Sequence, residues 1–210
     1  SERYDGECIA IPCDLSSMEG IELFAQQIAE REDGIDFLIN NAGAAWGETF
    51  EDFSEAGWDK VMDLNVKSIF FLTQKLKSLL TRNASTEDPS RVINIGSIDG
   101  LNVPAFETYS YSTSKAAVHH LTRVLATKLV KENILVNAIA PGPYPSAMLG
   151  LAVNSDYSVI ADANPRGRVG TPEDIAGLAI FLCSRAGAYT VGETITSDGG
   201  LIKTAGHRLG

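Results

Sequence analysis

The chain has 210 residues, 44% of them hydrophobic, and a formal net charge of −10 at pH 7. This length and apolar content predict one globular domain over residues 1–210, because domains commonly hold about 100–200 residues. The acidic balance and the lack of a lysine or arginine cluster argue against a nucleic-acid partner. The sequence shows neither a signal peptide nor an apolar run of the roughly 20 residues that cross a membrane. Its three cysteines lack metal-ligand spacing, so we expect no metal site and reduced thiols in the cytoplasm.

The first predicted elements are a strand and a helix. Residues 7–17 are typical of a short strand, at about 8–13, followed by a helix start. Ser16 and Glu19 have the spacing of a capping box. Apolar residues then recur at helical spacing as far as Gly34, which we expect to mark the end of the helix.

The next strand and helix bring two features of interest. Residues 35–43 predict a buried strand that ends in a turn rich in asparagine and glycine, where the backbone can approach a ligand closely. A long helical pattern runs from Ser54 to about Arg82. Asn65 lies inside it, and because asparagine competes for backbone hydrogen bonds, it predicts a local distortion or a contact with a functional water. A solvated side chain is the plainer interpretation.

The second half of the chain continues the alternation. Residues 91–97 (RVINIGS) are typical of a buried parallel strand, so Ser97 is expected at a carboxyl end, where open α/β sheets bind ligands. Residues 134–142 and 193–200 predict two more strands, and Thr171-Pro172 has the pattern of a helix start. This order predicts an α/β fold, a doubly wound Rossmann-type parallel sheet with helices on both faces.

The segment 143–165 has an irregular pattern. Because it follows a strand end, it could form a lid over an apolar substrate, or it could be a packed connection. Four side chains hint at an apolar carbonyl substrate such as an acyl chain: Trp46, Phe106, Tyr144 and Met148.

Tyr111 and Lys115 are four residues apart on a predicted helix, which places them one turn apart on one face. A lysine ammonium there would stabilise a phenolate and lower the tyrosine pKa from about 10, as a general acid or base requires. Such a pair often occurs by chance, but Ser97 and Tyr111 can converge here on one carbonyl oxygen. Tyr109 is the competing acid, although its offset of six from Lys115 places it on another face.

Six motifs in this order resemble the short-chain dehydrogenase/reductase family over essentially the whole chain, most closely its 3-oxoacyl-[acyl-carrier-protein] reductases and their fungal relatives. The motifs are NNAG at 40–43, LNV around Asn65, INIGS ending at Ser97, YSTSK from Tyr111 to Lys115, APGPYPS at 140–146 and SDGG at 197–200. The resemblance implies hydride transfer between a nicotinamide cofactor and the carbonyl or alcohol carbon of a small-molecule substrate. It favours NADP over NAD, and a 3-oxoacyl or other apolar ketone as substrate.

The resemblance also implies a role for each matching residue. Tyr111 would exchange the proton of the substrate oxygen, Ser97 would hydrogen-bond the same oxygen, and Lys115 would lower the tyrosine pKa and hold the nicotinamide ribose. Asn65 would keep a water in the proton relay. The expected cofactor-binding residues are Asp14 and Leu15 at the adenine, Asn41, Ala42 and Gly43 at the ribose, Pro141, Gly142, Pro143, Tyr144 and Ser146 at the nicotinamide carboxamide, and Tyr111 and Lys115.

Two features depart from the family pattern. The interval from Ser97 to Tyr111 is one residue longer than expected, which a loop can absorb. The Gly-rich turn that binds the cofactor pyrophosphate has no counterpart in the sequence, so the first βαβ unit is expected to be missing. The strand at 8–13 would then have no neighbour and the next strand would be an edge. We expect this polypeptide by itself to bind the cofactor poorly or not at all.

Two other functions compete with a reductase. One is a non-catalytic interaction subunit or inactive fragment that keeps the dimer surfaces, although the intact set of Ser97, Tyr111, Lys115 and Asn65 favours descent from an enzyme. The other is a sugar-nucleotide epimerase or dehydratase, against which the SDGG ending and the lack of a substrate domain argue.

The helices also predict how the chain associates. Their apolar faces, at 58–80 and 118–129, exceed what one sheet face needs to cover. Together with the habit of the family, they predict a homodimer or homotetramer. His119 and His120 have no partner at a useful spacing, so we expect them at the surface or an interface.

Overall fold

The computed structural model describes residues 6–104, 106–146, 149–150 and 156–204. Within these ranges, four parallel strands form one sheet in the order β1-β2-β3-β4. The strands are β1 (Phe37–Asn40), β2 (Ser90–Ile95), β3 (Ile134–Pro141) and β4 (Thr194–Ser197). The predicted α/β class with a Rossmann-type parallel sheet is confirmed.

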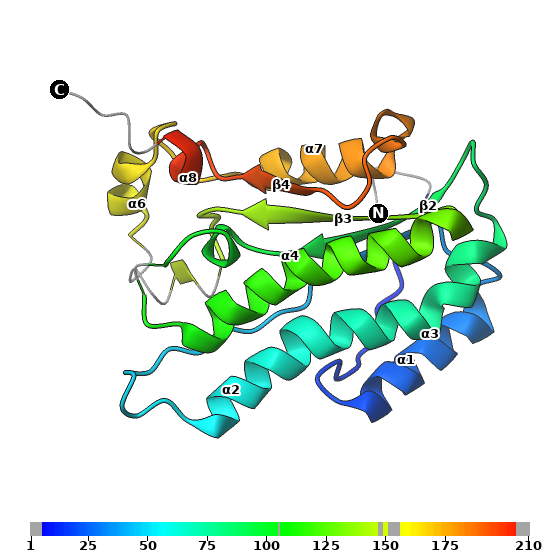
Figure 1. The fold of residues 1–210 in the computed structure, drawn as a ribbon, viewed down its shortest axis with the longest axis horizontal. Coiled ribbons are helices and arrows are strands. Elements are labelled where there is room, and N and C mark those ends of the chain that lie inside the picture. Colours follow the sequence, from blue (N-terminus) through cyan, green and yellow to red (C-terminus); the bar gives the residue numbers. More distant parts are fainter. Residues whose placement is uncertain (1–5, 105, 147–148, 151–155, 205–210) are drawn as a thin grey trace.

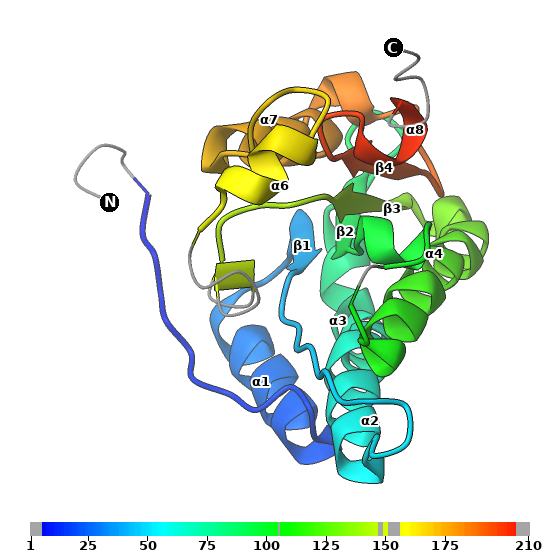
Figure 2. The ribbon, with the colours of Figure 1, turned by 90° about the vertical axis from the view of Figure 1, so that its left-hand side faces the viewer.

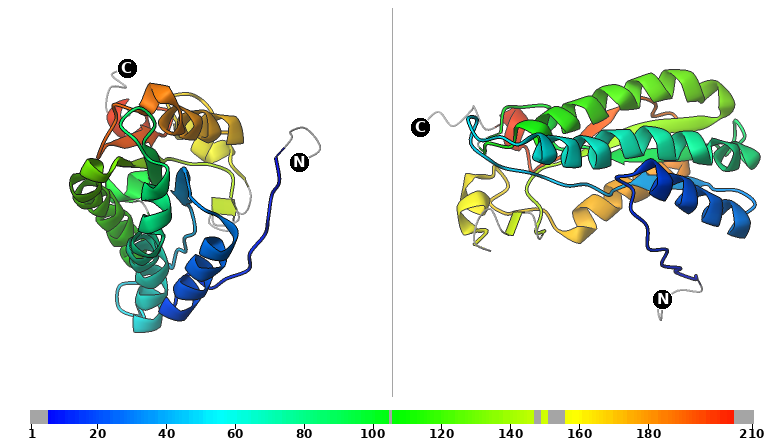
Figure 3. Two further views of the ribbon diagram at one scale, coloured as in Figure 1. Left: turned by 90° about the vertical axis from the view of Figure 1, so that its right-hand side faces the viewer. Right: turned by 90° about the horizontal axis from the view of Figure 1, so that it is seen from below.

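Helices cover the sheet from two sides (Figures 2 and 3). On one side lie α1 (Met18–Arg31), α3 (Ser68–Arg82) and α4 (Tyr109–Leu129), and α2 (Glu55–Met62) extends α3. On the other side lies α7 (Pro172–Cys183), capped by Thr171 as its sequence predicts. The shorter helices are α6 (Ser158–Ala163), α8 (Leu201–Thr204) and the 3₁₀ turns η2 (Ile98–Gly100), η3 (Val130–Glu132) and η4 (Arg185–Gly187). In the part of the chain described, no helix is long and apolar enough to cross a membrane.

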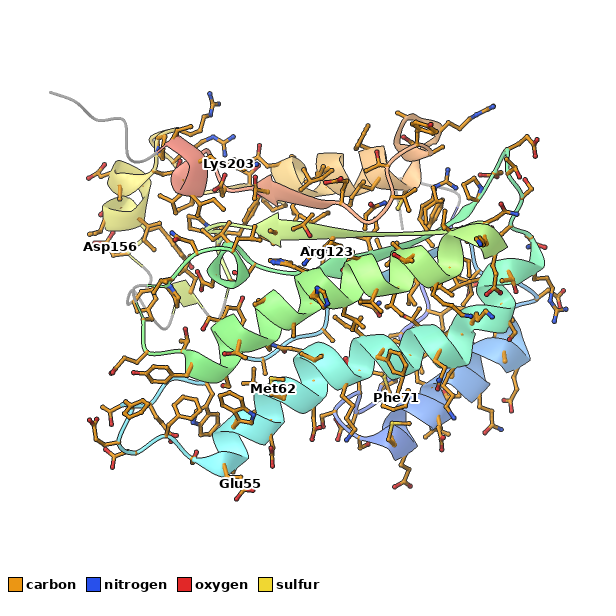
Figure 4. The ribbon with its side chains drawn as sticks, viewed as in Figure 1. Glu55, Met62, Phe71, Arg123, Asp156 and Lys203 are labelled. Carbon is orange, nitrogen blue, oxygen red and sulfur yellow. The ribbon has the colours of Figure 1, made fainter. Side chains whose placement is uncertain are left out.

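Alternate residues of the central strands supply two separate cores, because successive side chains of a strand point to opposite faces. Val92 and Val136 pack with residues of α3 and α4. Ile93 and Ile139 pack with Leu182 of α7 on the opposite face. A third cluster joins α1 to α3, where Phe71 projects from α3 toward α1 (Figure 4).

The long helical pattern after Ser54 forms one helical run, but it is not α-helical throughout. Between α2 and α3 lies a π-helical turn, η1 (Asp63–Lys67), with Asn65 at its centre. π-turns inside α-helices are rare and frequently occur at functional sites. The distortion predicted from Asn65 is therefore confirmed, and its buried side chain is not solvated.

The amino-terminal predictions are partly wrong. Residues 6–14 form no strand, and they run outside the sheet (Figure 2). A strand forms only where a neighbour supplies hydrogen bonds, and β1, as expected, is an edge of the sheet. Helix α1 is capped by Ser17 rather than Ser16, and it ends at Arg31 with Glu32 as its C-cap, before Gly34.

The segment 143–165 is more regular than predicted, because it contains α6. The carboxyl ends of the strands, the first turn of α4, α6 and α8 lie at the same end of the molecule (Figure 1). Since open α/β sheets bind ligands outside the carboxyl ends of their strands, this end of the molecule is the expected place for a ligand site.

Candidate active site

Ser97 follows the end of β2 and caps the short turn η2. Its backbone is extended, with φ −165° and ψ 155°, and its Oγ accepts the Asp99 backbone N–H at 3.1 Å. The hydroxyl proton remains available to a further partner. The strand end thus presents one buried hydroxyl with a fixed orientation.

Helix α4 brings Tyr111 and Lys115 to this strand end. Lys115 is 5% exposed, and its Nζ donates a hydrogen bond of 2.8 Å to the Ile95 backbone oxygen. The same Nζ lies 5.5 Å from the centroid of the Tyr111 ring. Burial lowers the pKa of Lys115 to about 8, because the charged form loses solvation. The predicted one-turn pairing of tyrosine and lysine is therefore present.

The predicted direction of the Tyr111 pKa is wrong for this structure. Burial raises the pKa of Tyr111 above 10.0, hydrogen bonding with the Ser97 side chain lowers it, and the charge of Asp99 raises it again. Burial is the largest of these effects, and the Lys115 ammonium, which bonds to the Ile95 oxygen, does not outweigh it. Tyr111 is therefore held as a neutral phenol, a form suited to donating a proton.

Asn65 ties the loop after β1 to α4. Its Oδ1 accepts the Ala44 N–H at 2.8 Å, and its Nδ2 donates to the Ala44 oxygen and the Ser114 Oγ, both at 2.9 Å. Ser114 in turn donates to the Tyr111 backbone oxygen at 2.7 Å. Both amide N–H groups of Asn65 thus bond to protein acceptors. The water expected at Asn65 stays a prediction.

The loop of Asn41, Ala42 and Gly43 lies open to solvent beside the lysine. A Cβ on Gly43 would lie 3.3 Å from the Asn65 Oδ1 and 3.6 Å from the Lys115 Nζ. The absence of a side chain leaves room for a group to reach the ammonium, which still has N–H donors to offer. This cradle fits the hydroxyls of a ribose.

Asp14 and Leu15 lie at the start of α1. The Asp14 carboxylate accepts hydrogen bonds from the backbone N–H and the hydroxyl of Ser16, which lower its pKa. Leu15 packs against the cluster between α1 and α3. Neither residue contacts the Tyr111 group, and their predicted position at an adenine stays a prediction.

The segment from Pro141 to Ser146 leaves the end of β3 toward β4. Gly142 lies against Asp198, and Pro143 accepts the Gly170 N–H at 2.9 Å. Tyr144 packs on Gly170, and its hydroxyl is 2.6 Å from the Ser197 Oγ. The Tyr144 side chain therefore points to β4, where it meets Ser197. Ser146 accepts the Leu149 N–H at 3.1 Å.

Tyr109, the competing acid, belongs to a different surface. Its hydroxyl donates to the Glu107 Oε1 at 3.0 Å, and its ring makes edge contacts with Phe50 and Phe53. Burial and the neighbouring carboxylates, first Glu107 and then Glu51, raise its pKa. Tyr109 is thus separated from Lys115, as the spacing predicts.

The four apolar side chains predicted to face a substrate are scattered. Trp46 packs against Gly57, with the Lys60 Nζ 4.9 Å from its ring. Phe106 is exposed in the loop before α4, and Met148 lies outside the described residues. The interpretation of 143–165 as a lid falls partly on undescribed residues as well.

The sequence alone does not place three residues that lie near Tyr111 in the site. His119 was expected at the surface or an interface but is 2% exposed, with its Nε2 3.4 Å from the Ser97 backbone nitrogen. Of the His119–His120 pair, His120 alone is exposed, as predicted. Asp99 and Ser114 contact the site through Ser97 and Asn65. The available signal was the spacing of His119, eight residues after Tyr111 and so on the same helix face.

Comparison with known proteins identifies the class. A family model described as Enoyl-(Acyl carrier protein) reductase matches residues 1–202. The chain belongs to the short-chain dehydrogenase/reductase family of NAD(P)-dependent oxidoreductases.

Individual relatives agree with this assignment. The chain is 49% identical over 197 residues to the rhamnolipids biosynthesis 3-oxoacyl-[acyl-carrier-protein] reductase of Pseudomonas aeruginosa, covering 93% of this chain and 77% of that protein. It is 38% identical over 198 residues to 2-dehydro-3-deoxy-D-gluconate 5-dehydrogenase of Dickeya dadantii, covering 91% and 75%. The solved Pseudomonas aeruginosa RhlG/NADP active-site complex superposes with a TM-score of 0.89 at 47% identity, covering 93% and 77%.

Proposed function

We propose that this protein catalyses hydride transfer between NADP and the carbonyl or alcohol carbon of a 3-oxoacyl or other apolar ketone, with Tyr111 as the general acid or base. The observation that carries the proposal is the convergence of Ser97, Tyr111 and Lys115 where β2 ends and α4 begins. The two hydroxyls belong to different elements, yet the Ser97 side chain is near enough to Tyr111 to lower its pKa, so both can grip one substrate oxygen.

In the reduction, Tyr111 donates its proton to the substrate oxygen as negative charge develops there. Its raised pKa keeps the phenol protonated near neutral pH. Ser97 donates its hydroxyl proton to the same oxygen, since its own lone pair is engaged by the Asp99 N–H. A nicotinamide held in this site would supply the hydride to the carbonyl carbon.

Lys115 serves both the tyrosine and the cofactor in this proposal. After Tyr111 gives up its proton, the ammonium over its ring stabilises the phenolate. Its N–H groups that are not bonded to Ile95 face the cradle at Gly43 and would hold the ribose. Asn65 fixes the Gly43 loop by clasping Ala44.

The choice of NADP and of a 3-oxoacyl substrate has separate support. The Pseudomonas aeruginosa relative is named a 3-oxoacyl-[acyl-carrier-protein] reductase, and the similar solved structure is an NADP complex. In this chain, Leu101, Val103 and Phe106 are exposed in the loop between Ser97 and α4. Exposed apolar side chains in the loop that joins Ser97 to the helix of Tyr111 favour an acyl chain over a sugar acid.

The test compares two tyrosines of one helix, Tyr111→Phe and Tyr109→Phe, in the protein as its gene encodes it. NADPH oxidation is measured with a 3-oxoacyl thioester. We expect Tyr111→Phe to lower kcat by about 10²–10⁴-fold, because general acid catalysis contributes that much. Tyr109→Phe should keep nearly full activity, and circular dichroism checks that both remain folded. Equal loss in the two variants would overturn the assignment, and an inactive parent protein would favour the non-catalytic alternative.

The association of the chain is proposed from its helices. Trp58 and Phe70 on the α2–α3 run and Val124 on α4 are exposed, although most of both apolar faces is buried. Covering them with a second copy would give the homodimer or homotetramer expected for this family. Light scattering at micromolar concentration tests this, and a monomer would contradict it.

A further inference from the structure

His119 is a buried titratable group that the proposed reaction does not use. It lies on α4 four residues after Lys115 and eight after Tyr111, so the three share one face of the helix. Its Nε2 is 3.4 Å from the Ser97 backbone nitrogen, which donates to it. The imidazole thus contacts the backbone of one reacting residue and belongs to the helix that carries the other.

The contact between His119 and the strand end is close. A Cβ on Gly96 would lie 2.1 Å from the His119 Nε2, so this ring position requires glycine before Ser97. On the other side of Ser97, a Cβ on Gly100 would lie 2.5 Å from the Lys115 backbone. Two glycines therefore let α4 approach the backbone on both sides of the serine.

Two polar contacts fix the register between this helix and the strand. Lys115 bonds to the Ile95 oxygen, and two residues later on the strand the Ser97 N–H bonds to His119. One turn of helix therefore matches two residues of extended chain. A slip of either element would separate the Ser97 hydroxyl from the Tyr111 hydroxyl, which lies at the start of the same helix.

The Ser97 side chain has little freedom once its amide is held. Its N–H donates to His119, and its Oγ accepts the Asp99 N–H at 3.1 Å. Rotating the Ser97 peptide to redirect the hydroxyl would break at least the first bond. The orientation of the hydroxyl thus depends on an acceptor at residue 119.

The imidazole can accept only when its Nε2 is unprotonated. Burial, followed by the charges of Lys115 and Arg123 on the same helix, lowers the pKa of His119 to about 4, and the Gly100 backbone partly opposes them. Arg123, labelled on α4 in Figure 4, is exposed to solvent. The acceptor therefore persists across the neutral range.

We propose that His119 is a positioning residue whose Nε2 holds the Ser97 amide and thereby sets the Ser97 hydroxyl against Tyr111. The inference rests on the proposed function, because it takes Ser97 and Tyr111 as the groups that grip the substrate oxygen. It adds a requirement at residue 119 for a neutral hydrogen-bond acceptor, and not only for a side chain that fills the space.

The kinetic test uses His119→Gln, which carries a neutral acceptor near the Nε2 position, and His119→Met, which fills a similar volume without a comparable one. We expect His119→Met to lower kcat by on the order of 10–100-fold, as small misplacements of reacting groups do, while KM for NADPH changes little. His119→Gln should recover most of kcat. The exposed neighbour gives the control, His120→Met, which should match the parent. Equal kcat in His119→Met and His119→Gln would overturn the proposal.

A second measurement tests the hydrogen bond between the Ser97 amide and His119 independently of catalysis. Imidazole ¹⁵N spectra at pH 7 should show His119 neutral with its proton on Nδ1, and the Ser97 amide should exchange slowly with solvent. In His119→Met that amide should exchange faster, and in His119→Gln it should stay protected. A proton on Nε2 would overturn the proposal. If Tyr111→Phe leaves activity intact while these spectra hold, the proposed function fails and the His119 contact does not.

Discussion

Strand β2, which ends where α4 packs, and the edge strand β1 carry similar apolar residues, but these residues differ greatly in how far they are buried. Ile93 of β2 and Ile39 of β1 are register partners, yet they are 1% and 46% exposed. Around Ile93, α7 covers the sheet, while Ile39 and Phe37 project from the same face of β1 with no such cover among the described elements. The strand that leads to Ser97 is thus embedded in a complete core, whereas β1 leaves two large apolar side chains uncovered.

The largest expected effect compares these two isoleucines. Ile93→Ala should lower the free energy of unfolding by about 2–5 kcal/mol, because it leaves a cavity between Ile139 and Leu182. Ile39→Ala removes the same atoms from a half-exposed site and should cost less than about 1 kcal/mol. Urea denaturation followed by circular dichroism measures both. Similar losses in the two variants would show that the β1 face is covered in solution.

The buried charge of Lys115 lowers the stability of the folded protein, and the exposed edge at β1 has no comparable cost. Its pKa falls from 10.5 to about 8, so at pH 7, below both values, the buried charge destabilises the fold by about 3 kcal/mol. Lys115→Met should therefore raise the stability by up to that amount while activity is lost. The exposed Lys128 on the same helix is the control, and Lys128→Met should stay within about 0.5 kcal/mol of the parent. A less stable Lys115→Met protein in denaturant titration would contradict this.

His119 should make the stability of the folded protein decrease in acid. Its pKa is 6.5 when unfolded and about 4 when folded, so the neutral form favours folding. This contribution is fully present above pH 6.5 and is lost as the pH falls toward 4, by about 3 kcal/mol in all. His119→Gln should flatten the stability profile in this window, and His120→Gln should not. Melting temperatures between pH 4 and 8 measure the slopes, and parallel profiles for the parent and His119→Gln would contradict it.

What the sequence predicts well are the elements whose signals are local. β2, β3, the capped α7 and the distortion at Asn65 follow from periodicity, cap residues and a poor helix former in mid-helix. The strand expected at 8–13 fails because an apolar run cannot reveal whether a neighbouring strand is there to pair with it.

The sequence predicts which residues form the site better than it predicts their electrostatic interactions. Helical spacing brings Tyr111 and Lys115 together, but it does not show that the ammonium bonds to Ile95 or that burial dominates the tyrosine pKa. His119 was misplaced because its partner is a backbone N–H, which leaves no side-chain motif in a sequence. Buried backbone groups require such partners, so a polar residue in helical register with the pair was the available clue.

The smallest expected effect concerns Asp99, whose charge raises the pKa of Tyr111. Asp99→Asn removes that charge but keeps the backbone N–H that bonds to Ser97. The pKa of Tyr111 should therefore fall. Alcohol oxidation needs the ionised tyrosine, so the rise of kcat/KM with pH should move to lower pH. Glu107, which bonds to Tyr109 instead, gives the matched control, and Glu107→Gln should leave the profile in place. A profile that moves equally in both variants would mean that net charge, and not the carboxylate beside Ser97, sets the proton affinity of Tyr111.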